Sequence, residues 1–213
     1  MPYKLAIFDF DGTLADSFAW FMRVVNDAAA VFAFKTIAPD ETDLLRGKSA
    51  REMVAHVGVP MWKMPLIASY MRRRKAQDLT SIRPFDGATA MLRDVHAAGI
   101  TLAGVSSNSE ANVRGILGTE PAALISHYEC GVSLFGKAAR FKNVLRRSGC
   151  GRAETIAIGD EIRDIEAARQ AGIAFGAVSG GYTLPEALTQ KRPEQMFHSF
   201  DDIRRELTAG GRQ

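Results

Sequence analysis

Four short apolar segments recur along the chain, and they constrain its fold more than any other feature. The first contains Leu-Ala-Ile-Phe, the composition of a strand that helices cover on both faces of a parallel sheet. Segments with helical periodicity alternate with the later ones, and each ends at a glycine, which favours a helix C-terminus. We therefore predict an α/β fold with a doubly wound parallel sheet. The apolar segments cover 4–10, 100–106, 154–160 and 173–179, and the helical segments cover 86–98, 137–148 and 163–171.

Residues 17–83 interrupt this alternation, because they contain helical patterns and no strand pattern. Ser49 and Glu52 have the spacing of a helix capping box. We predict two domains, a core formed by residues 1–16 and 84–213 and an all-helical insert formed by residues 17–83. The insert has 11 basic and 6 acidic residues and a formal charge of +5, so the rest of the chain carries −2. The helical patterns of the insert cover 17–33, 49–57 and 61–78.

The composition is that of a globular protein, with 46% hydrophobic and 24% charged residues among 213. The net charge of +3 is mild, and we interpret the single dense basic cluster, Arg72 to Lys75, as a solvated helix face. Nucleic acid is therefore not an expected partner. No apolar run approaches the ~20 residues that span a bilayer, and the first 20 residues lack a signal-peptide pattern. We predict a cytoplasmic protein in which Cys130 and Cys150 are free thiols, and we make no prediction of its oligomeric state.

Polar side chains follow the apolar segments at the points where the strands are expected to end. Ligands of an open parallel sheet bind beyond the carboxyl ends of its strands, so these side chains are the candidate site residues. Together they form an acidic cluster with hydroxyl groups and one ammonium. They are Asp9 and Asp11 after the first strand, Ser106 and Ser107 after the second, Lys137 at the start of a helix, and Asp160, Glu161 and Asp164 after the third.

Carboxylates that converge in one cleft repel each other, and a divalent cation with oxygen ligands relieves that repulsion. Mg²⁺ fits best, since it also takes phosphate oxygens of a substrate. Asp9 could then attack phosphorus as a nucleophile while Lys137 neutralises charge on the transferring group. Asp11 points the same way as Asp9 if the backbone stays extended, so it could act as a general acid and then as a general base. The cluster therefore predicts phosphoryl-transfer chemistry.

Four motifs in this order resemble those of the haloacid dehalogenase superfamily. They are Asp9-Phe-Asp11-Gly12-Thr13, Ser106 after an apolar strand, Lys137, and Gly159-Asp160-Glu-Ile-Arg-Asp164 followed by Ala-Ala-Arg-Gln-Ala-Gly. The segments GVSSNS, SLFGKA and GDEIRDIEAARQAG are similar to the phosphoglycolate phosphatase-like branch. The resemblance implies a Rossmann-like catalytic core with a helical cap. It also implies a Mg²⁺-dependent phosphatase that hydrolyses a small phosphomonoester through an aspartyl-phosphate.

The resemblance assigns roles to individual residues. Asp9 becomes nucleophile and metal ligand, Asp11 becomes acid/base and a ligand through its carbonyl, and Asp160 becomes a second side-chain ligand. Asp164 is either an outer metal residue or a carboxylate that the first turn of a helix favours. Two choices stay open, since Ser107 competes with Ser106 as the main phosphate-binding hydroxyl and Lys142 competes with Lys137. The phosphate-binding set is Gly12, Thr13, Ser106, Ser107 and Lys137.

The insert raises the question of specificity. Residues 46–52 resemble the specificity loop of capped relatives, which makes Lys48 and Arg51 candidates for contact with an anionic part of the substrate. The alternative is that this loop only caps a helix. Other activities also stay open: a sugar-phosphate mutase, a phosphonatase that uses Lys35, Lys48 or Lys63, and a regulatory protein that accepts a phosphoryl group without turnover. A dehalogenase is disfavoured, because that branch places no acidic residue at Asp11.

Overall fold

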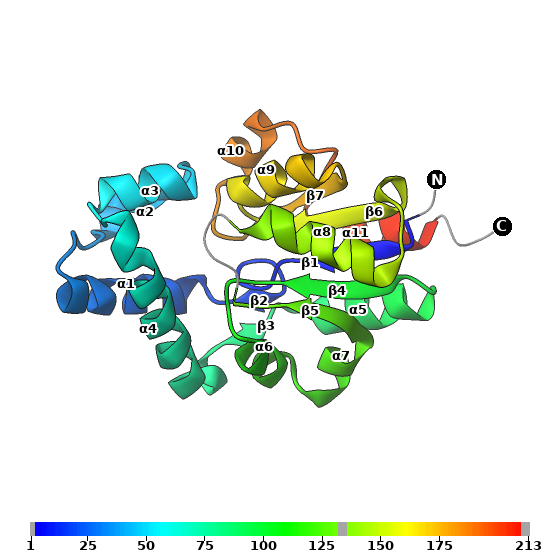
Figure 1. The fold of residues 1–213 in the computed structure, drawn as a ribbon, viewed down its shortest axis with the longest axis horizontal. Coiled ribbons are helices and arrows are strands. Elements are labelled where there is room, and N and C mark those ends of the chain that lie inside the picture. The colour runs from blue at the N-terminus through cyan, green and yellow to red at the C-terminus, as the bar shows by residue number, and fades with distance from the viewer. Residues whose placement is uncertain (1–2, 132–135, 210–213) are drawn as a thin grey trace.

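The computed structural model describes residues 3–131 and 136–209. Its centre is a sheet of six parallel strands in the order β5-β4-β1-β6-β7-β8 (Figure 1). The chain runs outward from β1 to β4 and β5, then returns beside β1 and continues to β6, β7 and β8, so the strand order reverses at β1. This is the predicted doubly wound sheet. The strands are β1 (Leu5–Phe8), β4 (Thr101–Val105), β5 (Ile125–Glu129), β6 (Thr155–Gly159), β7 (Ala174–Val178) and β8 (Gln195–Phe197).

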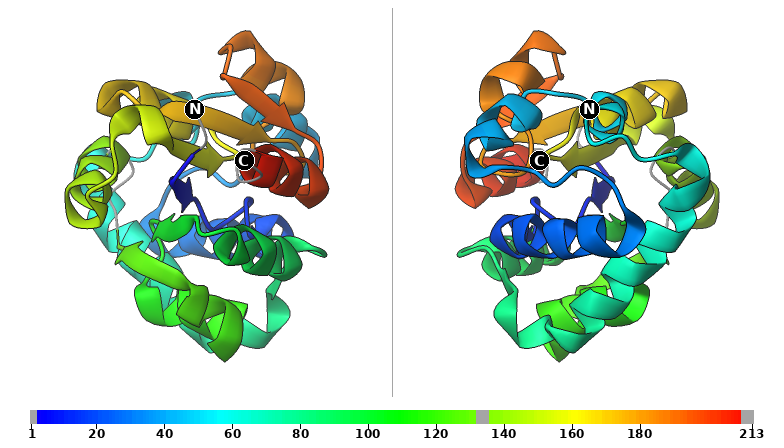
Figure 2. Two further views of the ribbon diagram at one scale, coloured as in Figure 1. Left: turned by 90° about the vertical axis from the view of Figure 1, so that its right-hand side faces the viewer. Right: turned by 90° about the vertical axis from the view of Figure 1, so that its left-hand side faces the viewer.

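Helices cover both faces of the sheet, as the apolar strands predict (Figures 1 and 2). Along β1, Leu5 and Ile7 pack into one apolar cluster with α8, α9 and α10, whereas Ala6 and Phe8 pack into another with α5, α6, α7 and α11. Side chains of a strand alternate between the faces, so β1 is buried on both. The helices are α5 (Ala88–Ala97), α6 (Glu110–Leu117), α7 (Thr119–Leu124), α8 (Lys137–Ser148), α9 (Ile162–Ala171), α10 (Pro185–Gln190) and α11 (Phe200–Thr208).

Residues 17–83, the predicted insert, contain the helices α1 to α4, which Figure 1 shows in blue to blue-green beside the sheet. A short antiparallel pair, β2 (Ala15–Asp16) with β3 (Arg83–Pro84), joins both ends of the insert to the core. The insert buries an apolar cluster of its own, with Ile37, Leu45 and Ile67 among its members. Its helices are α1 (Phe18–Phe32), α2 (Thr42–Arg46), α3 (Ala50–His56) and α4 (Met64–Gln77).

Several smaller expectations are also met. The capping box at the start of α3 is present, since the Ser49 N–H donates to the Glu52 carboxylate at 2.9 Å. Cys130 and Cys150 are free thiols. None of the helices between residues 3 and 131 or between 136 and 209 is long and apolar enough to cross a membrane. The division into a core of residues 1–16 and 84–213 and a cap of residues 17–83 stays a prediction.

Candidate active site

The first carboxylate of the site lies at the carboxyl end of β1. The Asp9 N–H donates to the Ile158 carbonyl of β6 at 2.8 Å, which continues the parallel pairing by one residue. Beyond it the chain turns sharply, and Gly12 takes a φ of +79°. A Cβ at Gly12 would overlap the Asp160 carboxylate, so this position needs glycine for space as well as for conformation. The turn therefore brings the first and fourth motifs into contact.

Three buried carboxylates meet at this turn. Oxygen atoms of Asp9, Asp160 and Asp164 lie within 4.8 Å of one another, and the three residues are only 6%, 0% and 1% exposed. The Lys137 ammonium stands among them, 2.6 Å from Asp9 Oδ2 and 2.5 Å from Asp164 Oδ1. The structure thus brings together the predicted nucleophile, lysine and metal-ligating side chains. It also places Asp164 inside the cluster rather than only on the first turn of α9.

The electrostatics of the cluster favour a bound cation. Burial raises the pKa of Asp9 to about 6, and the Asp164 carboxylate adds to the shift although Lys137 opposes it. Burial also raises the pKa of Asp160 well above its usual range, and Glu161 and Asp9 add to that shift. Asp164 Oδ2 is buried and accepts no hydrogen bond from any described residue. Closely spaced, under-neutralised oxygen donors of this kind fit a hard divalent metal ion.

Asp160 is held from two sides. The Thr13 hydroxyl donates to Asp160 Oδ1 at 2.6 Å, and the Tyr182 N–H donates to Oδ2 at 2.7 Å. Thr13 is fully buried, so its side chain positions a carboxylate, and its predicted contact with phosphate stays a prediction. Gly181 is required here as well, because a Cβ on it would overlap Asp160. Tyr182 and Gly181 were not predicted from the sequence, although a Gly-Gly-Tyr turn shortly after a buried strand was a usable signal.

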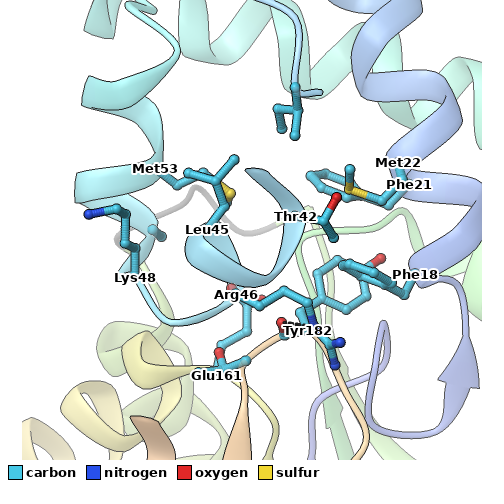
Figure 3. A pocket seen from close by; sticks show the side chains of 13 residues that line it. Phe18, Phe21, Met22, Thr42, Leu45, Arg46, Lys48, Met53, Glu161 and Tyr182 are labelled. Carbon is cyan, nitrogen blue, oxygen red and sulfur yellow. Dashed lines mark hydrogen bonds between the residues drawn. The ribbon is translucent and has the colours of Figure 1, made fainter. Parts of the chain in front are cut away.

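The segment that holds Asp160 also contacts the insert. Arg46, the last residue of α2, donates to the Gly181 carbonyl at 2.9 Å and the Tyr182 carbonyl at 3.2 Å. Its guanidinium lies 4.9 Å from the centre of the Phe18 ring, and Figure 3 shows Arg46 reaching toward Phe18 and Tyr182. The Tyr182 hydroxyl lies 3.0 Å from the Ser17 hydroxyl. One short segment of the core therefore contacts both the Asp160 carboxylate and the insert.

The competing hydroxyl and lysine candidates differ in burial and in position. Ser106 follows β4 and is buried, and its hydroxyl accepts the Asn108 N–H at 3.0 Å. Ser107 is half-buried. Lys137 opens α8 at the carboxylate cluster, whereas Lys142 is exposed on the same helix. Residues 133–135 of the preceding SLFG segment lie outside the described residues.

The interpretation of Arg72 to Lys75 as a solvated helix face is wrong. Lys75 is only 5% exposed, its ammonium pairs with Asp11 Oδ1, and it lies 4.6 Å from the centre of the Trp20 ring. Arg72, one turn earlier on α4, donates to the Ser107 carbonyl at 3.3 Å. Of the four, only Arg73 is exposed. The physical reason is that α4 turns one face toward Asp11, whose charge needs a counterion, and the opposite net charges of insert and core were the available signal.

Lys48 and Arg51 lie on different cavities. Lys48 lines a small cavity of about 30 Å³ between the insert and the Tyr182 segment, and in Figure 3 its amino group points away from Arg46. Arg51 lines a cleft of about 520 Å³ together with Lys137 and Arg163. Arg51 therefore shares a cleft with the predicted phosphate-binding lysine, and the cavity that Lys48 lines is a different one.

Two lysines proposed for a phosphonatase have other partners. Lys35 pairs with Glu41 at 2.5 Å, and Lys63 donates to the Phe32 carbonyl at 2.7 Å. Both contacts are internal to the insert. The lysine that the insert does bring to the site is Lys75, through its ion pair with Asp11.

Comparison with known proteins decides the family. A model described as haloacid dehalogenase-like hydrolase matches residues 6–178, which include all four motifs. The chain belongs to this family. It is similar to phosphoglycolate phosphatases of Synechococcus elongatus, at 29% identity over 97% of this chain and 98% of the relative, and of Agrobacterium fabrum, at 29% over 92% and 88%. The solved structure of a predicted phosphatase from Clostridium acetobutylicum matches with a TM-score of 0.82 and 20% identity, over 98% of this chain and 100% of that one.

This haloacid dehalogenase-like hydrolase is thus placed in the phosphoglycolate phosphatase-like branch, and the resemblance drawn from its motifs is confirmed. The match also covers the insert, because residues 6–178 run through all of α1 to α4.

Proposed function

We propose that this hydrolase is a Mg²⁺-dependent phosphatase that cleaves a small, phosphoglycolate-like monoester through an aspartyl-phosphate on Asp9. One observation carries the proposal. Asp9 is a buried carboxylate beside the Lys137 ammonium and two further carboxylates, and Asp11 follows it by two residues at the same strand end. The names of the relatives supply the substrate class, since both curated proteins compared above are phosphoglycolate phosphatases.

The residues divide the reaction between them. An Asp9 oxygen attacks phosphorus and forms a P–O bond as the bond to the substrate alkoxide breaks, and the alkoxide takes a proton from the Asp11 carboxyl group. Asp11, now a carboxylate, then removes a proton from a water molecule that attacks the aspartyl-phosphate, which releases phosphate and restores Asp9. Lys137 neutralises negative charge on the phosphoryl oxygens.

Mg²⁺ would be held by Asp9 and Asp160, with Asp164 beside them and the Asp11 carbonyl as the family resemblance implies. When bound, the ion supplies charge neutralisation for the phosphoryl group. Thr13 and Tyr182 keep the Asp160 carboxylate in place for that role through their two hydrogen bonds.

A panel assay tests the proposed activity. With Mg²⁺ present, we expect phosphate release from phosphoglycolate to exceed that from sugar phosphates and nucleoside monophosphates by at least about tenfold in kcat/KM, because Arg51 and Arg163 line the same cleft as Lys137 and can bind a second anionic group. Conversion of a sugar phosphate into its isomer without phosphate release would instead indicate a mutase. A stably phosphorylated protein without turnover would indicate a phosphoryl acceptor.

The cleft that Arg51 shares with Lys137 supports Arg51 as the proposed anion contact. We expect Arg51→Ala to raise KM for phosphoglycolate by about tenfold or more and to leave 4-nitrophenyl phosphate nearly unchanged, because an aryl phosphate has no second anionic group to bind. Lys48→Ala is the matched control, since it removes a cation from the same loop but from a different cavity. Steady-state kinetics on both substrates measure this. Equal losses on both substrates with Arg51→Ala would return the loop to a capping role, and a larger effect of Lys48→Ala would transfer the contact to that residue.

A further inference from the structure

Two buried asparagines lie between the insert and Asp11. Asn108 follows β4, Asn112 lies in the first turn of α6, and each is only 3% exposed. The Asn108 amide donates to Asp11 Oδ2 at 3.4 Å, and the Asn112 amide donates to Asn108 Oδ1 at 2.9 Å and to the Arg72 carbonyl of α4 at 3.0 Å. Neither asparagine was among the predicted site residues, although Asn108 lies in the GVSSNS segment. Buried polar side chains are normally hydrogen-bonded, so the partners of these two amides indicate what they do.

Backbone groups establish which way each amide points. The Ser109 N–H can only donate, and it lies 2.9 Å from Asn108, so the atom facing it is Oδ1 and the Asn108 amino group faces Asp11. The Arg72 carbonyl can only accept, so the Asn112 atom facing it is Nδ2. Both hydrogens of Asn112 Nδ2 and both lone pairs of Asn108 Oδ1 are then used. Neither side chain can turn over without losing hydrogen bonds.

These contacts close a ring around the Asp11 carboxylate. Starting from α4, Lys75 pairs with Asp11 Oδ1, Asn108 donates to Oδ2, and Asn112 joins Asn108 back to Arg72, one turn before Lys75. Each oxygen of Asp11 therefore has a partner: Oδ1 pairs with Lys75 of the insert, and Oδ2 accepts from Asn108 of the core. Asn108 is in turn linked to α4, because Asn112 hydrogen-bonds both Asn108 and the Arg72 carbonyl.

We propose that Asn108 and Asn112 are positioning residues for Asp11: Asn108 orients its carboxyl group, and Asn112 orients Asn108 according to whether α4 is seated on the core. The inference rests on the proposed acid/base role of Asp11. It adds that proton transfer to the leaving group is productive only when α4 is in place, because displacement of α4 removes Lys75 and loosens the Asn112–Asn108 pair together.

The dependence of kcat/KM on the basicity of the leaving group tests the inference. A general acid matters when the departing oxygen is strongly basic and matters little for a stabilised phenolate. We therefore compare phenyl phosphate with 4-nitrophenyl phosphate, two substrates of similar shape, through kcat/KM, which reports the steps up to cleavage of the ester. The ratio of the two values does not depend on how much of a variant is folded, because inactive protein lowers both values equally.

We expect Asn108→Leu to lower kcat/KM for phenyl phosphate by about 10- to 100-fold and that for 4-nitrophenyl phosphate by less than about threefold. Asn112→Leu should change the ratio in the same direction by a smaller factor. Asn26→Leu is the matched control, since Asn26 also makes two hydrogen bonds, both to Ile37 within the insert, and touches nothing at Asp11. It should leave the ratio unchanged.

Asp11→Asn separates this inference from the proposed function. If Asp11→Asn shifts the ratio strongly and neither Asn108→Leu nor Asn112→Leu does, the positioning role is refuted and the acid/base role stands. If Asp11→Asn leaves the ratio unchanged, the acid/base assignment itself fails and the inference fails with it. If Asn108→Leu shifts the ratio and Asn112→Leu does not, the proposed role of Asn112 in linking Asn108 to the insert is refuted.

Discussion

Replacing Asp9 by asparagine is expected to lower turnover by on the order of 10⁴-fold or more, because an amide cannot attack phosphorus and no neighbouring group can replace a nucleophile at its own position. In the proposed mechanism Asn108 and Asn112 act through Asp11, whereas Asp9 itself forms the bond to phosphorus. Acid-quenched reactions with a labelled substrate should contain phosphorylated protein for the native chain and none for Asp9→Asn.

The fold should survive this change. Asparagine has nearly the shape of aspartate, and it removes one negative charge from a cluster of three buried carboxylates, of which Asp9 and Asp164 pair with Lys137. The thermal unfolding midpoint in metal-free buffer is therefore not expected to fall. Asp16→Asn provides the control, because Asp16 belongs to the same segment but is exposed, so its activity should stay within about twofold. Activity of Asp9→Asn within about tenfold of the native level would rule out the covalent mechanism.

The central strands and the residues at their ends were predictable because one physical rule governs both. A parallel strand buried on both faces must be apolar throughout, so β1, β4, β6 and β7 are visible in the sequence. Their carboxyl ends lie at one edge of the sheet, which brings together Asp9, Ser106 and Asp160 although they are far apart in the chain.

The elements that were not predicted lack such a rule. β5 lies at the edge of the sheet, and its central residues Ser126, His127 and Tyr128 are not buried, so no apolar run marks it. β8 has three residues, and α2 has five, which is too short for helical periodicity to show. Short or half-exposed elements are held by their neighbours rather than by their own composition.

The contacts that support the site were missed for a different reason. Thr13 and Asp160 are 147 residues apart, and their contact depends on the return of β6 to the side of β1. No local spacing encodes that contact. Lys75 was misread because a run of four basic residues looks the same whether its helix faces water or a partly buried carboxylate. Only the register of α4 against the core, set by packing, distinguishes the two.

The insert contacts the site at two separate points, and the site chemistry differs between them. Lys75 and the Arg72 carbonyl reach the Asp11 side, while Arg46 reaches the segment whose Tyr182 N–H holds Asp160. Movement of the insert would therefore disturb both the proposed acid/base group and a carboxylate of the proposed metal site. If the insert moves as a lid over the cleft, we expect its closure to be coupled to assembly of the site.

Removal of divalent metal is expected to abolish activity, and Mg²⁺ is expected to restore it. Asp9, Asp160 and Asp164 leave the buried cluster short of positive charge even with Lys137 present, and Asp164 Oδ2 has no hydrogen-bond partner among the described residues. Ca²⁺ should be a poor substitute, because it takes more ligands at longer distances and in looser geometry than Mg²⁺. Activity after dialysis against a chelator, followed by addition of each ion, measures this.

A readout independent of turnover is available, because an ion that binds only the folded chain raises the unfolding midpoint as its concentration increases. We expect Mg²⁺ to raise the midpoint of the native protein and to have little effect on Asp160→Asn, which loses the charge. Its amide oxygen can still accept from the Tyr182 N–H, and its amide nitrogen can donate to the Thr13 hydroxyl. Glu166→Gln is the matched control, since Glu166 is exposed on the same helix as Asp164 and lies outside the carboxylate cluster. It should retain the full Mg²⁺ response. Full activity in chelator, or an equal Mg²⁺ response in Asp160→Asn, would rule out a metal ion at this site.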